Sequence, residues 1–290
     1  MPLSGKIMTT TDAFRFLESL EAGSVDLIIS SPPYFMGKEY DTSMNKEDFC
    51  KIHDALAPLL TKVLKPGGSL CWQVGHHVVQ GTTFPLDIPV YTAFSAQKEL
   101  TLRNRIIWTF GHGMHARRRF SGRYETILWF TRGSDYYFNL DAVRVPQKYP
   151  GKKHYKGPRK GEWSGNPGGK NPTDVWEIPN VKANHIEKTD HPCQFPVALA
   201  QRLVRALCPP GGLVIDCFAG VATVGVAALI EGRKFRGCDL NPTYVAIGKE
   251  RLDACAEGKL SYRPIDRPIL VPSMGAAVAR PPSHFKASSD

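Results

Sequence analysis

The chain has 290 residues, of which 42% are hydrophobic and 22% charged, and this balance excludes both a small stapled scaffold and a largely disordered chain. Lys and Arg number 37 against 27 Asp and Glu, and the resulting net charge of +10 is the sign expected for a protein that binds nucleic acid. Seven cysteines without a CxxC pair favour reduced thiols over a disulfide framework or a zinc knuckle. No stretch approaches the ~20 apolar residues of a membrane span, and the first residues lack the apolar region of a signal peptide. We therefore expect a soluble, cytoplasmic protein with no membrane partner.

Residues 1–130 alternate strand and helix patterns. The run VDLIIS at Val25–Ser30 is nearly continuous in apolar residues, which predicts a buried parallel strand. Apolar residues at helical spacing predict a helix from Phe49 to Val63 that ends before Pro66-Gly67-Gly68. Further strands are expected at 69–74, 105–109 and 126–130.

The middle and the end of the chain differ from residues 1–130 in composition and in predicted secondary structure. Residues 131–190 are rich in Gly, Pro, Lys and Asn, which predicts an insert between two halves of one α/β domain. Strand and helix patterns return over 191–260, and residues 261–290, spaced by prolines, predict an extended and partly disordered tail. In the second half the expected strands are 213–216 and 235–239, and the expected helices lie along 199–207, from about 223, and from 242.

Basic residues form two clusters that aromatic residues interleave. An interleaved pattern suits contact with phosphates and stacking on bases better than a plain solvated face, although a basic surface kept for solubility is the alternative. The arginine cluster consists of Arg117, Arg118, Arg119 and Arg123, and the lysine-rich cluster of Lys152, Lys153, Lys156, Arg159 and Lys160.

The segment VIDCFAGVATVG at 214–225 predicts a strand, a glycine-containing turn and a helix. Such a turn places backbone N–H groups beside a ligand, and Asp239, at the tip of the next strand, is positioned to bind ribose hydroxyls. The turn is neither GxGxxG nor a Walker motif, so a dinucleotide and a nucleoside triphosphate are disfavoured. The segment therefore indicates a nucleoside-cofactor site, with an ordinary strand-to-helix turn as the alternative.

The tetrapeptide Ser31-Pro32-Pro33-Tyr34 follows the strand VDLIIS directly. Two prolines remove two N–H donors and leave carbonyl oxygens as unshared acceptors at an edge where α/β sheets bind ligands. A hydroxyl, a proline carbonyl and an aromatic face suit a flat base that bears an amine. A proline-rich loop cap is the alternative reading.

Taken together, SPPY, DCFAG, Asp239, HPCQFP and FSGRYETILWF resemble, over roughly residues 7–252, the motifs of the S-adenosylmethionine-dependent DNA amino-methyltransferases of the permuted β group. The resemblance implies a doubly wound, mainly parallel, seven-stranded Rossmann-like sheet with an antiparallel final hairpin and an inserted recognition region. The domains would then be a catalytic half at 1–130, a target-recognition insert at 131–190, a cofactor half at 191–260 and a tail at 261–290. Duplex DNA is the implied partner, and a homodimer and a cognate restriction endonuclease are further ones.

The resemblance also implies roles for residues. Ser31, Pro32, Pro33 and Tyr34 match the catalytic tetrapeptide, and Asp12 matches the acid that contacts the adenine amine of the cofactor. The residues implied to bind the cofactor are Asp12, Ala13, His191, Gln194, Pro196, Asp216, Phe218, Ala219, Gly220, Thr223 and Asp239. Two positions depart from the family pattern: the second glycine of the loop is Ala222, which a negative φ would accommodate, and a common lysine is Phe195.

The expected reaction is methylation of the N4 amine of a cytosine flipped out of duplex DNA, with adenine N6 as the runner-up. Serine at the first catalytic position is associated with cytosine in the family, and a hydroxyl, unlike a carboxylate, can also donate toward cytosine N3. Neither a metal nor a covalent intermediate is required. The histidine pairs His76-His77 and His112 with His115 lack the neighbouring Cys or carboxylate ligands that a zinc site would need.

Other chemistries stay open at this point. Pro192-Cys193 spells the dipeptide of C5-cytosine methylation, but it lies before a helix and not after the strand that carries the catalytic loop. Methylation of RNA or of protein glutamine, and a noncatalytic DNA-binding protein, are the remaining alternatives.

Overall fold

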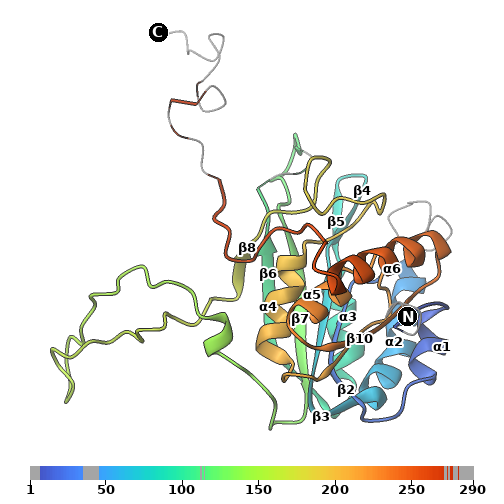
Figure 1. The fold of residues 1–290 in the computed structure, drawn as a ribbon, viewed down its shortest axis with the longest axis horizontal. Coiled ribbons are helices and arrows are strands. Elements are labelled where there is room, and N and C mark those ends of the chain that lie inside the picture. Colours follow the sequence, from blue (N-terminus) through green and yellow to red (C-terminus); the bar gives the residue numbers. More distant parts are fainter. Residues whose placement is uncertain are drawn as a thin grey trace.

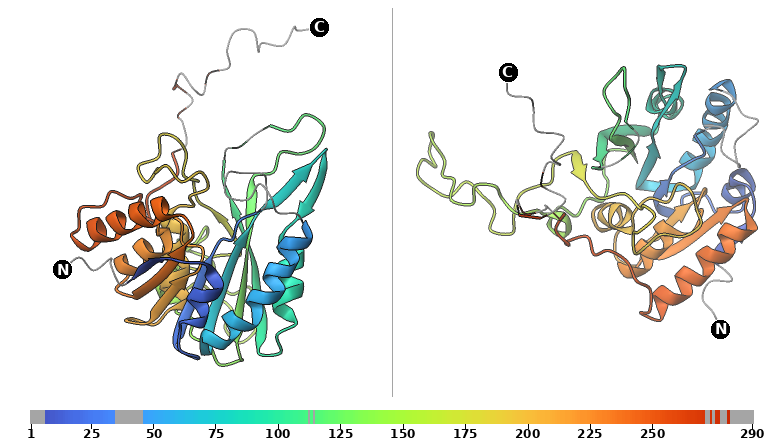
Figure 2. Two further views of the ribbon diagram at one scale, coloured as in Figure 1. Left: turned by 90° about the vertical axis from the view of Figure 1, so that its right-hand side faces the viewer. Right: turned by 90° about the horizontal axis from the view of Figure 1, so that it is seen from above.

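The computed structural model describes residues 7–34, 46–111, 113, 115–270, 273, 275, 276 and 280. One eight-stranded sheet runs through the molecule in the order β1-β10-β9-β2-β3-β7-β6-β8, and helices cover both of its faces (Figures 1 and 2). Its strands are β1 (Met8–Thr10), β2 (Val25–Ser30), β3 (Leu64–Val74), β6 (Leu100–Thr109), β7 (Tyr124–Arg132), β8 (Val175–Glu177), β9 (Leu213–Asp216) and β10 (Lys234–Asp239). The helices are α1 (Ala13–Glu18), α2 (Lys46–Val63), α3 (Asp87–Ser95), α4 (Val197–Leu207), α5 (Thr223–Ile230) and α6 (Pro242–Ala256), and β4 (His76–Val79) and β5 (Thr82–Pro85) form a separate hairpin.

The parallel half of the sheet explains where a ligand can bind. β2 lies between β9 and β3 and pairs parallel with both, with Leu27 opposite Val214 on one side and Ser69 on the other. Since the chain reaches β3 directly after β2 but reaches β9 only after the insert, the strand order reverses at β2, and such switch points open a crevice at the carboxyl ends. The two motif-bearing strands, β2 and β9, are therefore neighbours in the sheet.

The antiparallel part lies toward the other edge. β7 pairs antiparallel with both β3 and β6, which confirms the expected hairpin. The sheet has eight strands and not seven because β8, from within the predicted insert, adds to β6 with Ile107 opposite Val175. This three-residue strand carries too little periodicity to be seen in the sequence.

Two apolar layers hold the helices to the sheet. Leu203, Val224 and Leu252, from α4, α5 and α6, are buried in one layer, and Phe16, Leu60 and Phe94, from α1, α2 and α3, are buried in the other. Both layers are needed because the central strands are apolar on both faces.

The start of β3 differs from the prediction. The strand begins at Leu64, directly after α2, and the expected breaker Pro66-Gly67-Gly68 lies inside it. A register shift opposite Val25 and Leu27 takes up the extra residues, and Gly67 adopts φ +77. A side chain at Gly67 would also meet the Asp135 carbonyl oxygen at 2.6 Å, so only glycine fits there.

The predicted insert forms a projecting arm. Between β7 and β8 the chain passes through the short helix η2 (Asp141–Val143) and then leaves the sheet edge as a long two-limbed loop (Figures 1 and 2). The bridges Val145 to Lys170 and Lys153 to Trp163 tie its two limbs together. We call residues 144–170 the arm.

The start of the predicted tail belongs to the folded body. Tyr262 and Ile265 pack against the core layer of α4 to α6, and the Arg263 amide donates to the Glu187 carboxylate at 3.0 Å. Within the described residues, no helix is both long and apolar enough to cross a membrane.

Candidate active site

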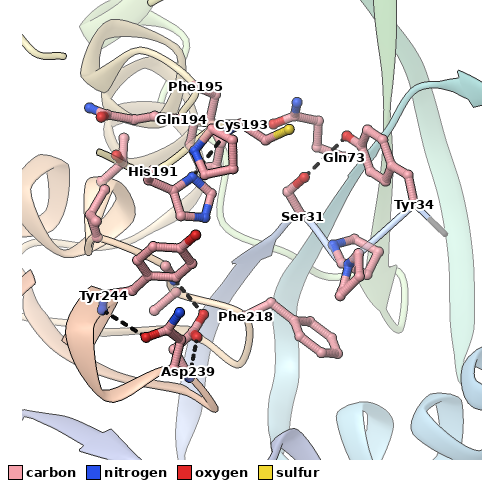
Figure 3. Close-up of a pocket in the computed structure, with 18 of the residues that line it drawn as sticks. Ser31, Tyr34, Gln73, His191, Cys193, Gln194, Phe195, Phe218, Asp239 and Tyr244 are labelled. Atoms are coloured by element: carbon pink, nitrogen blue, oxygen red, sulfur yellow. Dashed lines mark hydrogen bonds between the residues drawn. The ribbon is translucent and has the colours of Figure 1, made fainter. Parts of the chain in front are cut away.

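A cavity of about 1050 Å³ lies at the carboxyl ends of β2, β9 and β10. Figure 3 shows Ser31 and Tyr34 on one side of it and His191 and Tyr244 on the other, with Phe218 and Asp239 below them in the view. The two predicted motifs therefore face one cavity, although about 180 residues of sequence separate them. All four residues of the tetrapeptide Ser31–Tyr34 lie in its wall.

The glycine loop after β9 is shaped by Asp239. The Asp239 carboxylate accepts hydrogen bonds from the backbone N–H groups of Gly220 and Asn241, each at 2.9 Å. Gly220 adopts φ +49, and a Cβ there would lie 3.0 Å from His191 Nε2, so the loop needs glycine at this point. Burial raises the pKa of Asp239, while the two N–H groups favour its charged form. The result is a carboxylate fixed at the cavity wall.

Ala222 corrects one expectation. Its φ is +59, in the left-handed region, and not the negative value that would make alanine easy to accommodate. A non-glycine residue there costs about 1–2 kcal/mol. The turn holds it through the Ala222 N–H to the Ala219 carbonyl at 2.8 Å, and Ala222 is fully buried, facing Gly248 of α6.

Asp216 has a different role from the one predicted. Its carboxylate accepts from the Ser30 hydroxyl at 2.6 Å and the Phe218 N–H at 3.0 Å, and the side chain does not line the cavity. It links the end of β2 to the start of the glycine loop. Burial raises the pKa of Asp216 to about 7, although both hydrogen bonds oppose the shift.

This raised pKa predicts a pH-dependent stability. Since the folded-state pKa of Asp216 lies above the ordinary value of 3.8, the folded protein keeps the proton longer, and its stability falls as pH rises from about 4 to about 7. Asp216→Asn keeps the acceptor oxygen but cannot ionise. We expect this variant to exceed the wild type in unfolding free energy by roughly 1–3 kcal/mol at pH 8, with no gain at pH 4.

Urea unfolding at the two pH values measures this difference. Asp174→Asn, at an exposed position just before β8, is the control and should show none. A variant Asp216→Asn that loses stability equally at both pH values would contradict the account.

Several predicted cofactor residues lie elsewhere. Asp12 caps α1, where its carboxylate accepts from the Arg15 backbone N–H at 3.0 Å, and Pro196 precedes α4; neither lines the cavity. Gln194 does line it, but its carboxamide is bonded to Thr189 and to the Glu187 carbonyl. The predicted residues that the structure brings together in the cavity wall are Ala13, His191, Gln194, Phe218, Ala219, Gly220, Thr223 and Asp239.

The tetrapeptide Ser31–Tyr34 is hydrogen-bonded to residues that the sequence analysis did not select. The Tyr34 hydroxyl donates to Glu125 Oε2 at 3.2 Å and lies 3.1 Å from Ser31 Oγ. Gln73 at the end of β3 donates to the same carboxylate oxygen at 2.5 Å. Burial, and then the nearby Glu125 charge, raise the pKa of Tyr34, so its phenol stays neutral.

Sequence signals for the missed residues exist but are faint. Gln73 is the single polar position in the run 70–74, and Glu125 is the single charged position in the run 124–131; each lies close to the cavity end of its strand. Trp108, Asn180 and Tyr244 also line the cavity. The ring of Tyr244 packs edge-on against His191 with centroids 4.6 Å apart, whereas the sequence predicted only a helix that begins at residue 242.

Cys193 is closer to the tetrapeptide than its sequence position indicated. It lines the same cavity, and its backbone N–H donates to His191 Nδ1 at 3.2 Å (Figure 3). The residue lies in the turn before α4 and is exposed.

The two basic clusters lie in different places. Arg117, Arg118 and Arg119 are exposed on the loop between β6 and β7, a loop that also supplies Phe110 and Gly113 to the cavity wall. The loop that carries the arginine cluster therefore forms part of the cavity wall. The lysine-rich cluster is exposed on the arm, away from the sheet (Figure 1); there Arg159 pairs with Glu162 at 2.8 Å and Lys153 lies over the Trp163 ring at 4.7 Å.

Among the described residues, no group of three or more His, Cys, Asp or Glu side chains is arranged to hold a metal ion. His76 packs against Tyr124, and His115 is exposed, whereas His112 lies outside the described residues.

Comparison with known proteins agrees with this geometry. The family model described as DNA methylase matches residues 25–250. The type II methyltransferase M.BglII of Bacillus subtilis is 43% identical over 242 residues, which cover 83% of this chain and 67% of that one. The DNA adenine methyltransferase YhdJ of Escherichia coli is 33% identical over 252 residues, covering 84% and 82%.

Two solved structures are similar. PvuII DNA methyltransferase (cytosine-N4-specific) superposes with a TM-score of 0.67 at 20% identity over 88% of this chain and 96% of that one, a likeness of fold. A Thermus thermophilus protein complexed with S-adenosyl-L-methionine superposes with a TM-score of 0.63 at 26% identity, covering 87% and 95%.

Proposed function

The chain belongs to the DNA methylase family, and from this premise we propose that it transfers a methyl group from S-adenosylmethionine to the N4 amine of a cytosine flipped out of duplex DNA. The observation that carries the proposal is a single cavity. It has the tetrapeptide Ser31–Tyr34 on one wall, and on another the glycine loop after β9 with Gly220 bonded to Asp239. Methyl transfer needs both partners in van der Waals contact, and a shared cavity allows it.

The residues present fit the cofactor. At Gly220 the loop approaches His191 so closely that a Cβ would fill the space between them, and beside it the Asp239 carboxylate suits two ribose hydroxyls. Phe218 and Tyr244 add flat surfaces to the same part of the cavity. S-adenosylmethionine supplies an electrophilic methyl group on a positively charged sulfur.

The tetrapeptide suits an amine. The amine nitrogen is a poor nucleophile because its lone pair is delocalised into the ring, and hydrogen bonds from its two N–H groups favour a pyramidal, more reactive nitrogen. Ser31 Oγ and a carbonyl of Pro32 or Pro33 are the acceptors that we assign to these N–H groups. The ring of Tyr34 is assigned to stacking on the flipped base.

The choice between cytosine and adenine rests on the association of serine with cytosine. The single hydrogen of the Tyr34 hydroxyl is directed at Glu125, so the Ser31 hydrogen is directed at Tyr34 and not toward a base nitrogen. In this arrangement the Ser31 hydroxyl does not donate to cytosine N3, so a hydrogen bond to N3 does not favour cytosine over adenine. Adenine N6 stays the runner-up, supported by the adenine methyltransferase YhdJ among the relatives.

Methylation at cytosine C5 is disfavoured despite Cys193 in the cavity. That reaction needs a thiolate as nucleophile. The Cys193 segment precedes α4, and the acceptor set of Ser31–Tyr34 would have no function in attack at carbon.

Duplex DNA is the partner that we assign to the basic surface. We assign the arginine cluster to phosphates around a flipped base, and the arm to base edges along the duplex. The name "type II methyltransferase" of several relatives supports a restriction–modification setting in the cytoplasm, with a cognate endonuclease and a homodimer as further proposals.

Salt dependence tests the DNA surface. If the clusters neutralise about six phosphates, duplex affinity should fall by roughly 10³-fold between 50 and 200 mM salt. Fluorescence anisotropy with a labelled duplex measures it, and Arg118→Ala should flatten the slope. An affinity that is flat across this range would contradict the assignment.

Transfer of labelled methyl groups tests the activity itself. Purified protein and S-adenosylmethionine with a tritiated methyl group should label duplex DNA, with much less label in an RNA duplex of the same sequence. A protein that binds duplex DNA but transfers no label would instead support the noncatalytic reading.

A further inference from the structure

A hydrogen-bonded chain leads from the catalytic serine to a carboxylate. Ser31 Oγ lies 3.1 Å from the Tyr34 hydroxyl, and that hydroxyl donates to Glu125 Oε2 at 3.2 Å. Two of the three side chains come from the tetrapeptide and the third from the second residue of strand β7, and all of them line the cavity. Gln73 Nε2 donates to the same carboxylate oxygen.

The carboxylate fixes the direction of this chain. A carboxylate only accepts, so the single hydrogen of the Tyr34 hydroxyl is committed to Glu125. Ser31 must then be the donor in its contact with Tyr34. This leaves the Ser31 oxygen with lone pairs and no hydrogen for the cavity, which is what an amine N–H requires.

Resting on the proposed function, we infer that Glu125 is a positioning residue that holds Ser31 as an acceptor and takes the amine proton through Ser31 and Tyr34. Methylation leaves the nitrogen with one proton too many, and neither a serine nor a neutral phenol can keep it. Glu125 is the group in this hydrogen-bonded series that can keep the proton.

The proton transfer balances. As the new N–C bond forms, the bond between the methyl carbon and the donor sulfur would break, and its electron pair would stay on that sulfur and neutralise it. The amine N–H bond also breaks, its proton passes to Ser31 Oγ, and its electron pair stays on nitrogen and cancels the positive charge there. The original Ser31 proton passes to the Tyr34 oxygen, and the Tyr34 proton passes to Glu125. Both hydroxyls end neutral, Glu125 ends as a carboxylic acid, and it later releases the proton to water.

Packing supports this arrangement. A Cβ at Gly75 would lie 3.2 Å from the Tyr34 ring and 3.6 Å from the Glu125 carboxyl carbon, so the absence of a side chain there makes room for the pair. Because the pKa of Tyr34 is raised, the phenol passes a proton on without becoming a stable anion.

Glu125→Gln tests the inference because glutamine keeps the size and an acceptor oxygen but cannot take a proton. Glu177→Gln, at an exposed glutamate of β8, is the matched control. Tyr34→Phe breaks the chain at its middle and serves as a second variant. Single-turnover transfer of labelled methyl groups to duplex DNA is followed in water and in deuterium oxide, and cofactor affinity is followed by calorimetry.

We expect Glu125→Gln to slow transfer by about 10²-fold with cofactor affinity within twofold of the wild type. The wild type should be slower in deuterium oxide, with a proton inventory that indicates several moving protons, and the variant should lose this isotope effect. The double variant with Tyr34→Phe should be no slower than the slower single variant.

The outcomes separate the two proposals. A wild type that transfers no methyl group to DNA would refute the proposed function. A wild type that transfers it while Glu125→Gln keeps a rate within threefold, or a wild type without a solvent isotope effect, would overturn the role of Glu125 alone.

Discussion

Asp239→Ala is expected to lower S-adenosylmethionine affinity by roughly 100-fold or more. In our assignment the carboxylate accepts two ribose hydroxyls, each hydrogen bond to a charged group contributes about 1.5–3 kcal/mol, and 1.4 kcal/mol is tenfold in affinity. The substitution also removes the acceptor for the Gly220 and Asn241 N–H groups, so the glycine loop loses its anchor. Both effects act in the same direction.

Isothermal titration calorimetry measures this loss. Glu250→Ala, at an exposed position of α6, removes a carboxylate outside the cavity and should bind normally. Near-normal affinity of Asp239→Ala would show that the glycine loop is not the cofactor site.

Ser31→Ala should have the second large effect, on rate and not on binding. The substitution removes the hydroxyl assigned to the amine and breaks the contact to Tyr34, so single-turnover methyl transfer should fall by about 10²–10³-fold. Affinity for cofactor and for duplex DNA should change little, because the glycine loop and the basic surface are untouched.

Ser24→Ala controls for loss of a hydroxyl near the same strand, since Ser24 bonds only to the Glu21 carbonyl among its described side-chain contacts and lies outside the cavity. If Ser31→Ala kept the wild-type rate, the Ser31 hydroxyl would have no role in catalysis. If it lost cofactor affinity as well, the division of the cavity into two sites would be wrong.

Local patterns were sufficient for the elements that carry the site. The apolar run of β2, the strand β9 and the starts of α5 at Thr223 and α6 at Pro242 agree with the structure to the residue. For β2 and β9 the local cause is a run buried on both faces, and for α6 it is a proline at the first turn after the capping side chain of Asn241. Helix α5 begins after Ala222 without a capping side chain.

The partners of these residues were not predictable from local patterns. Asp12 and Asp216 follow the expected acidic pattern, but local hydrogen bonds to Arg15 and Phe218 bind their carboxylates, and a sequence does not show which acceptor a side chain will satisfy. Glu125 meets Tyr34 only because β7 returns antiparallel beside β3, a pairing between segments far apart in the chain. The positive φ of Ala222 follows from the path of the whole loop around Asp239, not from alanine itself.

The identity of the methylated nucleoside is the most direct test of the account. Duplex DNA treated with purified protein and S-adenosylmethionine is digested to nucleosides and analysed by mass spectrometry, with Ser31→Ala as the negative control. The account predicts N4-methyldeoxycytidine in the wild-type sample and a strong reduction in the control. N6-methyldeoxyadenosine would move the assignment to adenine, and 5-methyldeoxycytidine would contradict the role given to Ser31.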